Sequence, residues 1–272
     1  MSAAAQVGRQ LRFTNKAFWR NPASAFFTFA FPLMFLVIFT SLLGSGEERI
    51  QGYELDTSTY YVGAMAAFGV ISACFTNIAI QTTFNRDAGI LKRLRGTPLP
   101  AASYMSARVI HAMVVGAILV VLTLLFGKFV YDSPLPTGGP VLEFVVSFLA
   151  GSLSFAALAL AVTALVPNAD AAPPIVNAII LPLLFLSGIF IPLNDNAPDW
   201  MRVVGNVFPV KHFAEAMRAG FLGNIIQVAP GAGPGGATRV FSFDWWDVAI
   251  VAAWGLVGLV LAARFFSWEP RR

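Results

Sequence analysis

The chain has 272 residues, of which 57% are hydrophobic and 12% are charged, and its mean hydropathy is +0.71. The core and surface of a soluble domain need far fewer apolar residues, so the composition excludes a soluble globular protein and indicates a membrane protein with several spans. The net charge is +4, and the only cysteine is Cys74, which excludes intrachain disulfides, cysteine-rich zinc sites and iron–sulfur clusters.

Residues 5–20 are predicted to form an amphipathic helix that lies on the membrane surface. At about 100° per residue, Val7, Leu11 and Phe18 fall on one face of this helix. The opposite face carries four cations, namely Arg9, Arg12, Lys16 and Arg20. A solvated basic tail is the alternative, but a basic amphipathic pattern favours an interfacial helix.

Six apolar segments are long enough to cross a membrane, because a bilayer core requires about 20 mostly apolar residues per helix. They lie near residues 25–43, 60–82, 105–126, 144–166, 172–191 and 247–264. None carries Asp, Glu, Lys or Arg in its middle, whereas proton- or sodium-coupled carriers usually need such groups. We therefore expect an all-α integral membrane protein with six transmembrane helices and an energy source outside the membrane.

A short cationic segment, NRDAGILKRLRGTPLP, fills residues 85–100 between the second and third expected spans. Asn85 is a suitable N-cap and Asp87 would lie in the first helical turn, while Gly96-Thr97-Pro98 would end the helix. Three cations would then lie near the carbonyl end of the helix dipole, namely Lys92, Arg93 and Arg95. The pattern predicts a rigid helix over residues 85–97 that protrudes from the membrane.

The segment between the fifth and sixth spans has helical patterns at 198–205 and 210–222, separated by Phe208-Pro209. Both patterns are too short and too polar to span. They suit re-entrant or interfacial helices within residues 195–222, which are allowed at membrane depth only where protein covers the broken backbone. Tyr60 and Tyr61, at the start of the second span, are expected as aromatic anchors at the membrane interface.

The cations are distributed unequally between the two sides of the membrane. One side carries twelve: Arg9, Arg12, Lys16, Arg20, Arg86, Lys92, Arg93, Arg95, Arg108, Arg264, Arg271 and Arg272. The other side carries six on longer loops. The positive-inside rule therefore predicts that both termini and the 85–100 segment are cytoplasmic in a multi-pass plasma-membrane protein. Anionic headgroups and an acidic protein surface explain these cations without a nucleic-acid partner.

No pattern of catalytic or metal-binding residues stands out in the sequence. The two histidines, His111 and His212, are far apart, and neither lies in an HExxH motif or beside a run of carboxylates. We expect His111 to be a polar residue that meets another span and His212 to belong to the segment after the fifth span. No GxSxG motif is present either. We therefore expect neither a catalytic residue nor a metal site.

The segment DAGILKRLRGTPLPAASYMSARV resembles the cytoplasmic coupling region of ABC type-2 permeases, the membrane subunits of ATP-driven exporters for drugs, lipids and polysaccharides. The matching residues are Asp87, Gly89, Lys92, Arg93 and Gly96-Thr97-Pro98-Leu99. A single Asp stands where the family often has two acidic residues.

Two further stretches are similar to the same family. Residues 187–223 are similar to its fifth span and external re-entrant helices, and ARFFSWEPRR is similar to its basic tail. The residues that occur in the expected order are Pro192, Pro198, Trp200, Pro209, Glu215 and Arg218. His212 after Lys211 departs from the usual pattern. The resemblance covers nearly the whole chain and implies a single permease domain over residues 1–272.

The resemblance also implies the partners and the functional residues. Because the chain has no Walker A motif, two copies of a separate ABC ATPase would bind ATP and Mg²⁺, and a second permease chain, identical or paralogous, would complete a dimer. The residues implied for ATPase coupling are Asp87, Gly89, Lys92, Arg93, Arg95, Gly96, Thr97 and Pro98. Those implied for a path between the chains are Phe68, Phe75, Asn77, Asn177 and Phe185, and those implied for an external gate are Pro192, Trp200, Pro209, Glu215 and Arg218.

Three functions are compatible with these patterns. The resemblance favours a permease that moves an amphipathic, lipid-like or drug-like substrate outward. A non-transporting scaffold or sensor that recruits a cytoplasmic partner through residues 85–100 is the alternative. An integral membrane enzyme acting on lipids is disfavoured, because no grouped carboxylates or histidines are visible in the sequence.

Overall fold

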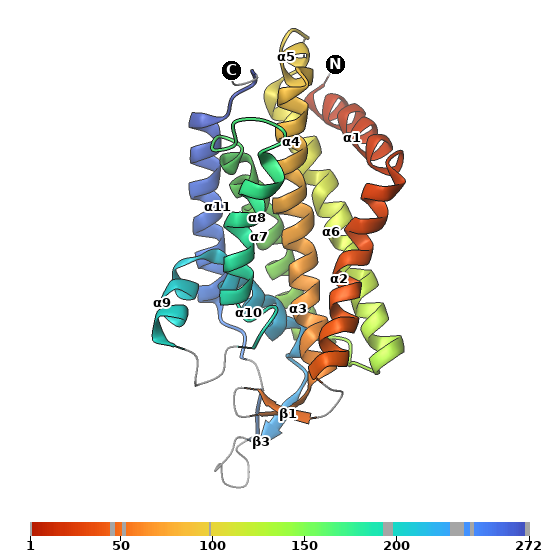
Figure 1. Ribbon diagram of the computed structural model, residues 1–272. Coiled ribbons are helices and arrows are strands. Elements are labelled where there is room, and N and C mark those ends of the chain that lie inside the picture. The colour runs from red at the N-terminus through yellow and green to blue at the C-terminus, as the bar shows by residue number, and fades with distance from the viewer. Residues whose placement is uncertain are drawn as a thin grey trace.

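The computed structural model describes residues 2–43, 47–50, 53–97, 99–192, 198–228, 237–239 and 242–269. It is a bundle of upright helices with both ends of the chain at the same end of the bundle (Figure 1). Within the described residues, five helical segments are long and apolar enough to cross a membrane. They are α2 (Pro22–Leu43), the continuous segment Thr57–Asp87, α6 (Ala101–Tyr131), α7 (Gly139–Val162) and α11 (Trp245–Phe265).

The remaining expected span, 172–191, is a shorter helix. α8 (Ala172–Leu186) has 15 residues, which at 1.5 Å per residue extend about 22 Å, less than the roughly 30 Å of a hydrocarbon core. The apolar sequence continues to Ile191, but the backbone leaves the helix at Ser187 and Gly188, whose φ is +74°. The structure thus confirms a largely helical membrane-protein fold, with five spans by length and a sixth apolar helix that is too short.

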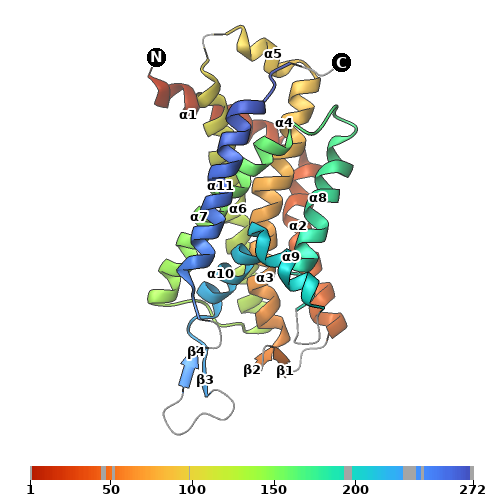
Figure 2. The ribbon, with the colours of Figure 1, turned by 90° about the vertical axis from the view of Figure 1, so that its left-hand side faces the viewer.

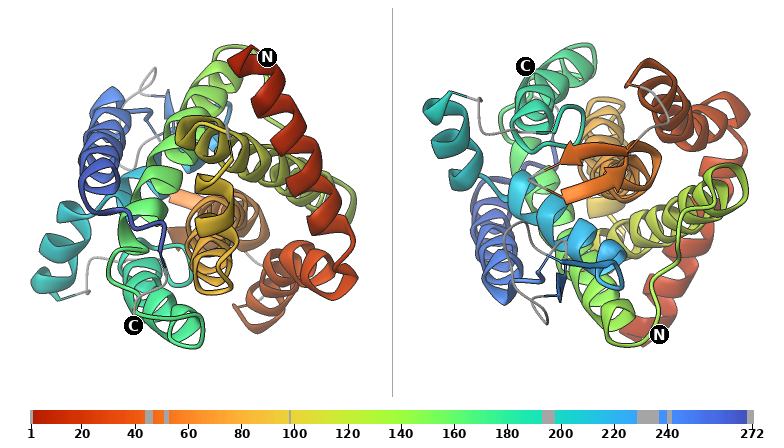
Figure 3. Two further views of the ribbon diagram at one scale, coloured as in Figure 1. Left: turned by 90° about the horizontal axis from the view of Figure 1, so that it is seen from above. Right: turned by 90° about the horizontal axis from the view of Figure 1, so that it is seen from below.

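The second span is the centre of the bundle. It consists of α3 (Thr57–Ile71), one π-helical turn, η1 (Ser72–Thr76), and α4 (Asn77–Asp87). Every residue of α3 is buried, and the view along the bundle shows the other helices around it (Figure 3). Small residues such as those in GAMAAFG allow this close approach of neighbouring helices.

Tyr60 and Tyr61 are core residues and do not anchor the helix at the membrane interface, so that prediction is wrong. Their exposed fractions are 2% and 0%. The Tyr60 hydroxyl donates to the carbonyl of Gly188 (2.7 Å), and the Tyr61 hydroxyl donates to that of Phe190 (3.0 Å). These carbonyls follow the end of α8 and have no helical partner, so buried hydroxyls satisfy them.

α7 and α11 pack along most of their length (Figure 2). Gly258 of α11 lies against the backbone of α7, where an added Cβ would lie 2.8 Å from the Leu158 nitrogen. Only glycine permits this contact.

The two ends of the bundle differ. One end, called the α5 end below, holds the two termini of the chain together with the helices α1 (Ala3–Trp19) and α5 (Ile90–Arg95) (Figure 1). The hairpin end is the opposite one, and its elements are β1 (Glu47–Ile50), β2 (Tyr53–Asp56), β3 (Ile226–Val228), β4 (Ala237–Arg239), α9 (Asp199–Val207) and α10 (Pro209–Leu222) (Figure 2). β1 pairs with β2, and β3 pairs with β4, each antiparallel.

Candidate functional site

The segment predicted as one helix over residues 85–97 consists of the end of α4 and a separate short helix, α5. The amides of Ala88 and Gly89 donate to the carbonyls of Phe84 and Arg86, so the spanning helix continues to Asp87. Gly89 then adopts a left-handed conformation (φ +68°) before α5 begins. The prediction that Asn85 is an N-cap is therefore wrong.

Asn85 is instead an interior residue of α4. Its amide group donates to the Tyr104 hydroxyl (3.3 Å). Asn is a common N-cap, but a cap needs a helix that starts there, and the preceding span does not stop.

Arg86 and Asp87 attach the end of α4 to the loop between α7 and α8. Arg86 is 1% exposed, and its guanidinium donates to the carbonyls of Thr163 (2.8 Å) and Val166 (2.5 Å). The Asp87 carboxylate accepts from the Ala169 amide (3.1 Å). Arg86 is thus not part of the exposed cationic surface, and Asp87 has an intramolecular partner.

α5 has one packed face and one exposed face. Leu91 is fully buried, whereas Lys92 and Arg93 are exposed. Gly96 and Thr97 follow as an exposed turn, in which the Thr97 hydroxyl donates to the Leu94 carbonyl (2.7 Å). The Arg95 side chain and Pro98 lie outside the described residues. The described cations of α5 are therefore available to a partner at this end of the bundle.

The segment expected to form an amphipathic helix on the membrane surface is the helix α1. It lies across the outside of the bundle at the α5 end (Figure 3) and packs mainly on α6. Its cations are all exposed, namely Arg9, Arg12, Lys16 and Arg20. Phe13 and Trp19 are also more than half exposed. A helix with exposed cations and exposed aromatic rings suits a membrane surface.

A groove of about 360 Å³ between α2, the second span and α8 brings three of the five expected path residues together. Phe68, Asn77 and Asn177 line it, with Ser72 and Thr76 of the π-helical turn between them. π-helical turns occur frequently at functional sites. Phe75 is 3% exposed and Phe185 lies outside the groove, so the structure does not group these two with the others.

Arg218 is the centre of a buried network at the hairpin end. It is 2% exposed, and its guanidinium donates to the Tyr60 hydroxyl and to the carbonyl of Gly188 (3.2 Å). Its guanidinium carbon also lies 4.9 Å from the centre of the Tyr60 ring. α10, α3 and the end of α8 are joined at this point.

The other expected gate residues differ in their surroundings. Pro209 is buried at the first position of α10, where proline is favoured. Trp200 on α9 is 61% exposed, and Pro192 is half-buried. Glu215 lies 3.7 Å from the Lys211 ammonium on α10. Only Arg218 and Pro209 belong to the core.

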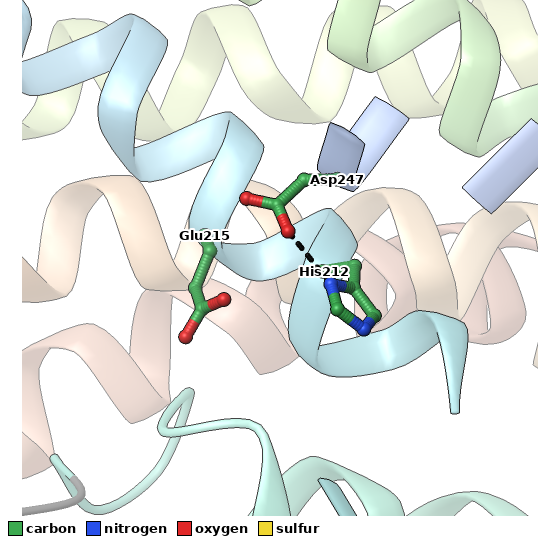
Figure 4. A group of neighbouring side chains, drawn as sticks. All are labelled: His212, Glu215 and Asp247. Carbon is green, nitrogen blue, oxygen red and sulfur yellow. Dashed lines mark hydrogen bonds and ion pairs between the residues drawn. The ribbon is translucent and has the colours of Figure 1, made fainter. Parts of the chain in front are cut away.

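His212, Glu215 and Asp247 lie together at the hairpin end (Figure 4), with one ligand atom from each within 4.8 Å of the others. His212 Nδ1 is 2.6 Å from an Asp247 oxygen, and Nε2 is 2.9 Å from the Asn206 carbonyl. Nε2 must donate to that carbonyl, and a proton lies between Nδ1 and Asp247, so neither nitrogen offers a lone pair to a metal. The cluster connects α9, α10 and α11.

The sequence did not reveal this cluster, because Asp247 follows His212 by 35 residues. The spacing of His212 and Glu215 places them on one face of α10. This spacing was the one indication in the sequence that the two side chains could belong to a common cluster. His111, expected to meet another span, packs against Phe18 of α1, with ring centres 5.3 Å apart, and lines a cavity together with Asn77 of the second span.

Comparison with known proteins agrees with this architecture. The model of a family described as "ABC-2 type transporter" matches residues 5–222, which extend from α1 to α10. The chain is also 26% identical over 197 residues to the protein named "Putative transport permease YvfS" of Bacillus subtilis (strain 168), and that similarity covers 71% of this chain and 76% of that protein. Since the family model matches most of the chain, this multi-pass membrane protein belongs to the ABC-2 type transporter family.

Proposed function

We propose that the chain is the permease subunit of an ATP-binding-cassette exporter, which moves an amphipathic, lipid-like or drug-like molecule outward. Two separate ATPase subunits would bind ATP with Mg²⁺ and hydrolyse it. The observation that carries this proposal is α5, a short helix with a buried face and an exposed cationic face beside the anchored end of the second span. The positive-inside rule supports an orientation with the α5 end and both termini in the cytoplasm of a plasma-membrane protein.

The contacts of α4 support a direct route from ATPase to membrane. Lys92 and Arg93 would contact an acidic surface of the ATPase, and α1 would form the other wall of the docking cleft. Because Arg86 holds α4 to the α7–α8 loop, a displacement of α5 would move the second span and α8 together. These two elements form two sides of the groove.

The groove supports an amphipathic substrate. Asn77 and Asn177 supply hydrogen-bonding groups, and Phe68 with Phe31 supplies apolar surface. The groove opens on the side of a single chain, so a second permease chain, identical or paralogous, would cover it and complete the path. The Arg218 network, next to the end of α8, would act as the external gate.

The test is co-purification of the tagged chain from its native membranes in a mild detergent. We expect a P-loop ATPase to co-elute with the wild type and to be lost from Lys92→Glu/Arg93→Glu, since both side chains are exposed. Lys128→Glu is the matched control, because this cation lies at the far end of α6 and is 42% exposed. Absence of an ATPase from the wild-type complex would overturn the proposal and favour a scaffold or sensor.

A further inference from the structure

A cavity of about 460 Å³ lies beneath α1 at the α5 end, between α1, α4, α5 and the start of α6. It adjoins the groove on the α8 side, and Ser24, Asn77 and Gln81 border both. Its volume falls in the usual range for small-molecule sites.

Much of the polar lining of the cavity comes from two facing helices, α4 and α6, and the rest comes from Gln10, Thr14, Asn21 and Ser24. On α4, three amide side chains recur every fourth residue, at Asn77, Gln81 and Asn85. Facing them on α6 are Tyr104, Arg108 and His111. Among the described residues that line the cavity, Arg108 is the single cation and there is no carboxylate. The cavity therefore has a net positive charge that its own walls do not neutralise.

Several polar groups of this wall lack a partner among the described residues. His111 is 8% exposed and its Nε2 has no hydrogen bond, and neither does the buried Nε of Arg108. The Tyr104 hydroxyl accepts from both Asn85 and Arg108, so its own proton is directed elsewhere. Buried polar groups in native proteins are nearly always paired. The Arg108 guanidinium and the Tyr104 hydroxyl thus offer donors to a ligand with acceptor oxygens and a negative charge.

The remaining residues that line the cavity are apolar, and the cavity lies beneath α1, a helix that suits a membrane surface. Phe18, Ile78, Leu94 and Val115 complete its walls. Phe13 lines it while remaining 66% exposed, which places this ring at the mouth. The cations of α1 on the outer surface favour an anionic leaflet. An oxyanion with an attached acyl chain fits this arrangement better than a free ion does.

We propose that the cavity beneath α1 binds the phosphate headgroup of an anionic membrane lipid, with Arg108, Tyr104 and His111 as its ligands. Ile90 and Leu94 of α5 form part of the same walls. The bound lipid therefore holds α5 against α1 and α6. If α5 transmits movement from an ATPase, as proposed above, the bound lipid would affect that transmission. Lipid binding itself does not depend on the proposed function.

The experiment is native mass spectrometry of the full chain in a neutral detergent, titrated with phosphatidylglycerol or with phosphatidylcholine of the same acyl chains. We expect phosphatidylglycerol to bind about tenfold more tightly than phosphatidylcholine, and Arg108→Gln to weaken it by about tenfold, since a charge-assisted hydrogen bond is lost. Arg12→Gln, on the exposed face of α1, is the matched control and should stay within about twofold of wild type.

A second variant tests the cavity without removing a buried charge. Ala17 is exposed and borders the cavity, so Ala17→Trp should block it and reduce phosphatidylglycerol binding while the chain still folds. Equal binding of both lipids, or equal losses in Arg108→Gln and Arg12→Gln, would overturn the proposal. Inorganic phosphate that binds as tightly as phosphatidylglycerol would overturn the lipid assignment. The chain is tested without an ATPase, so failure here is distinguishable from failure of the exporter proposal.

Discussion

Arg86 illustrates how one residue can have a different role from its neighbours in a cationic segment. Its sequence context is an exposed basic loop, but its side chain is buried against the carbonyls of Thr163, at the C-cap of α7, and of Val166 in the loop that follows. The last carbonyls of a helix have no partner within the helix. Arg86 supplies donors to that end of α7, and a cation there also complements the helix dipole.

Replacement of Arg86 should destabilise the fold. Arg86→Ala leaves the buried carbonyls of Thr163 and Val166 without these donors, at a cost of roughly 1–3 kcal/mol for each unsatisfied group. Arg86→Lys retains the charge but loses the fork geometry, so an intermediate effect is expected. Thermal unfolding in detergent measures both, with the exposed Lys92→Ala as the control. An unchanged melting temperature for Arg86→Ala would show that these hydrogen bonds contribute nothing.

Glycine positions determine how closely whole elements pack. At Gly258, α11 contacts the backbone of α7, and an added Cβ would lie 2.8 Å from a main-chain nitrogen that cannot move aside. At Gly8 of α1, nothing lies within 4 Å of the corresponding point. The same residue type is therefore required in one helix and replaceable in the other.

Alanine substitutions at these two glycines should have opposite effects. Gly258→Ala should separate α11 from α7 and lower the melting temperature. Gly8→Ala should be neutral or favourable, because alanine stabilises a helix by about 1 kcal/mol relative to glycine. Circular dichroism melts of the two purified variants provide the comparison. Equal melting temperatures would contradict the close packing of α7 and α11.

At the scale of the molecule, hydropathy predicts most of the membrane-spanning helices, because burial in lipid demands apolar composition over a fixed length. It does not predict where the backbone leaves the helix, and α8 ends at Leu186 although the apolar sequence continues to Ile191. Nor does local sequence identify partners across the bundle. Tyr60 and Tyr61 suit an interface by composition, yet tertiary contacts bury them.

The sequence predicted part of the candidate site, namely the segments and residue types, but it did not predict contacts between distant parts of the chain. The resemblance located the coupling segment, and three of the expected path residues do line one groove. The attachment of Asp87 to Ala169 was not predictable, since it joins residues 82 positions apart.

The orientation of the whole molecule can be tested by thiol labelling, because the native Cys74 is fully buried and should not react. We expect Asp132→Cys at the hairpin end to react with a membrane-impermeant maleimide in intact cells, as this side chain is 91% exposed. Thr97→Cys at the α5 end should react only after permeabilisation. Reversed labelling would place the termini outside the cell.

The second span is fixed near both ends, by Tyr60 with Arg218 near one end and by Arg86 at the other. Its 31 residues extend about 46 Å, so it behaves mechanically as a strut under axial load. A helix fixed at both ends bends where it is least stiff. In the second span that place is the π-helical turn Ser72–Thr76, because its hydrogen bonds depart from the α pattern. Deformation would therefore concentrate halfway along the helix, where Ser72 and Thr76 border the groove.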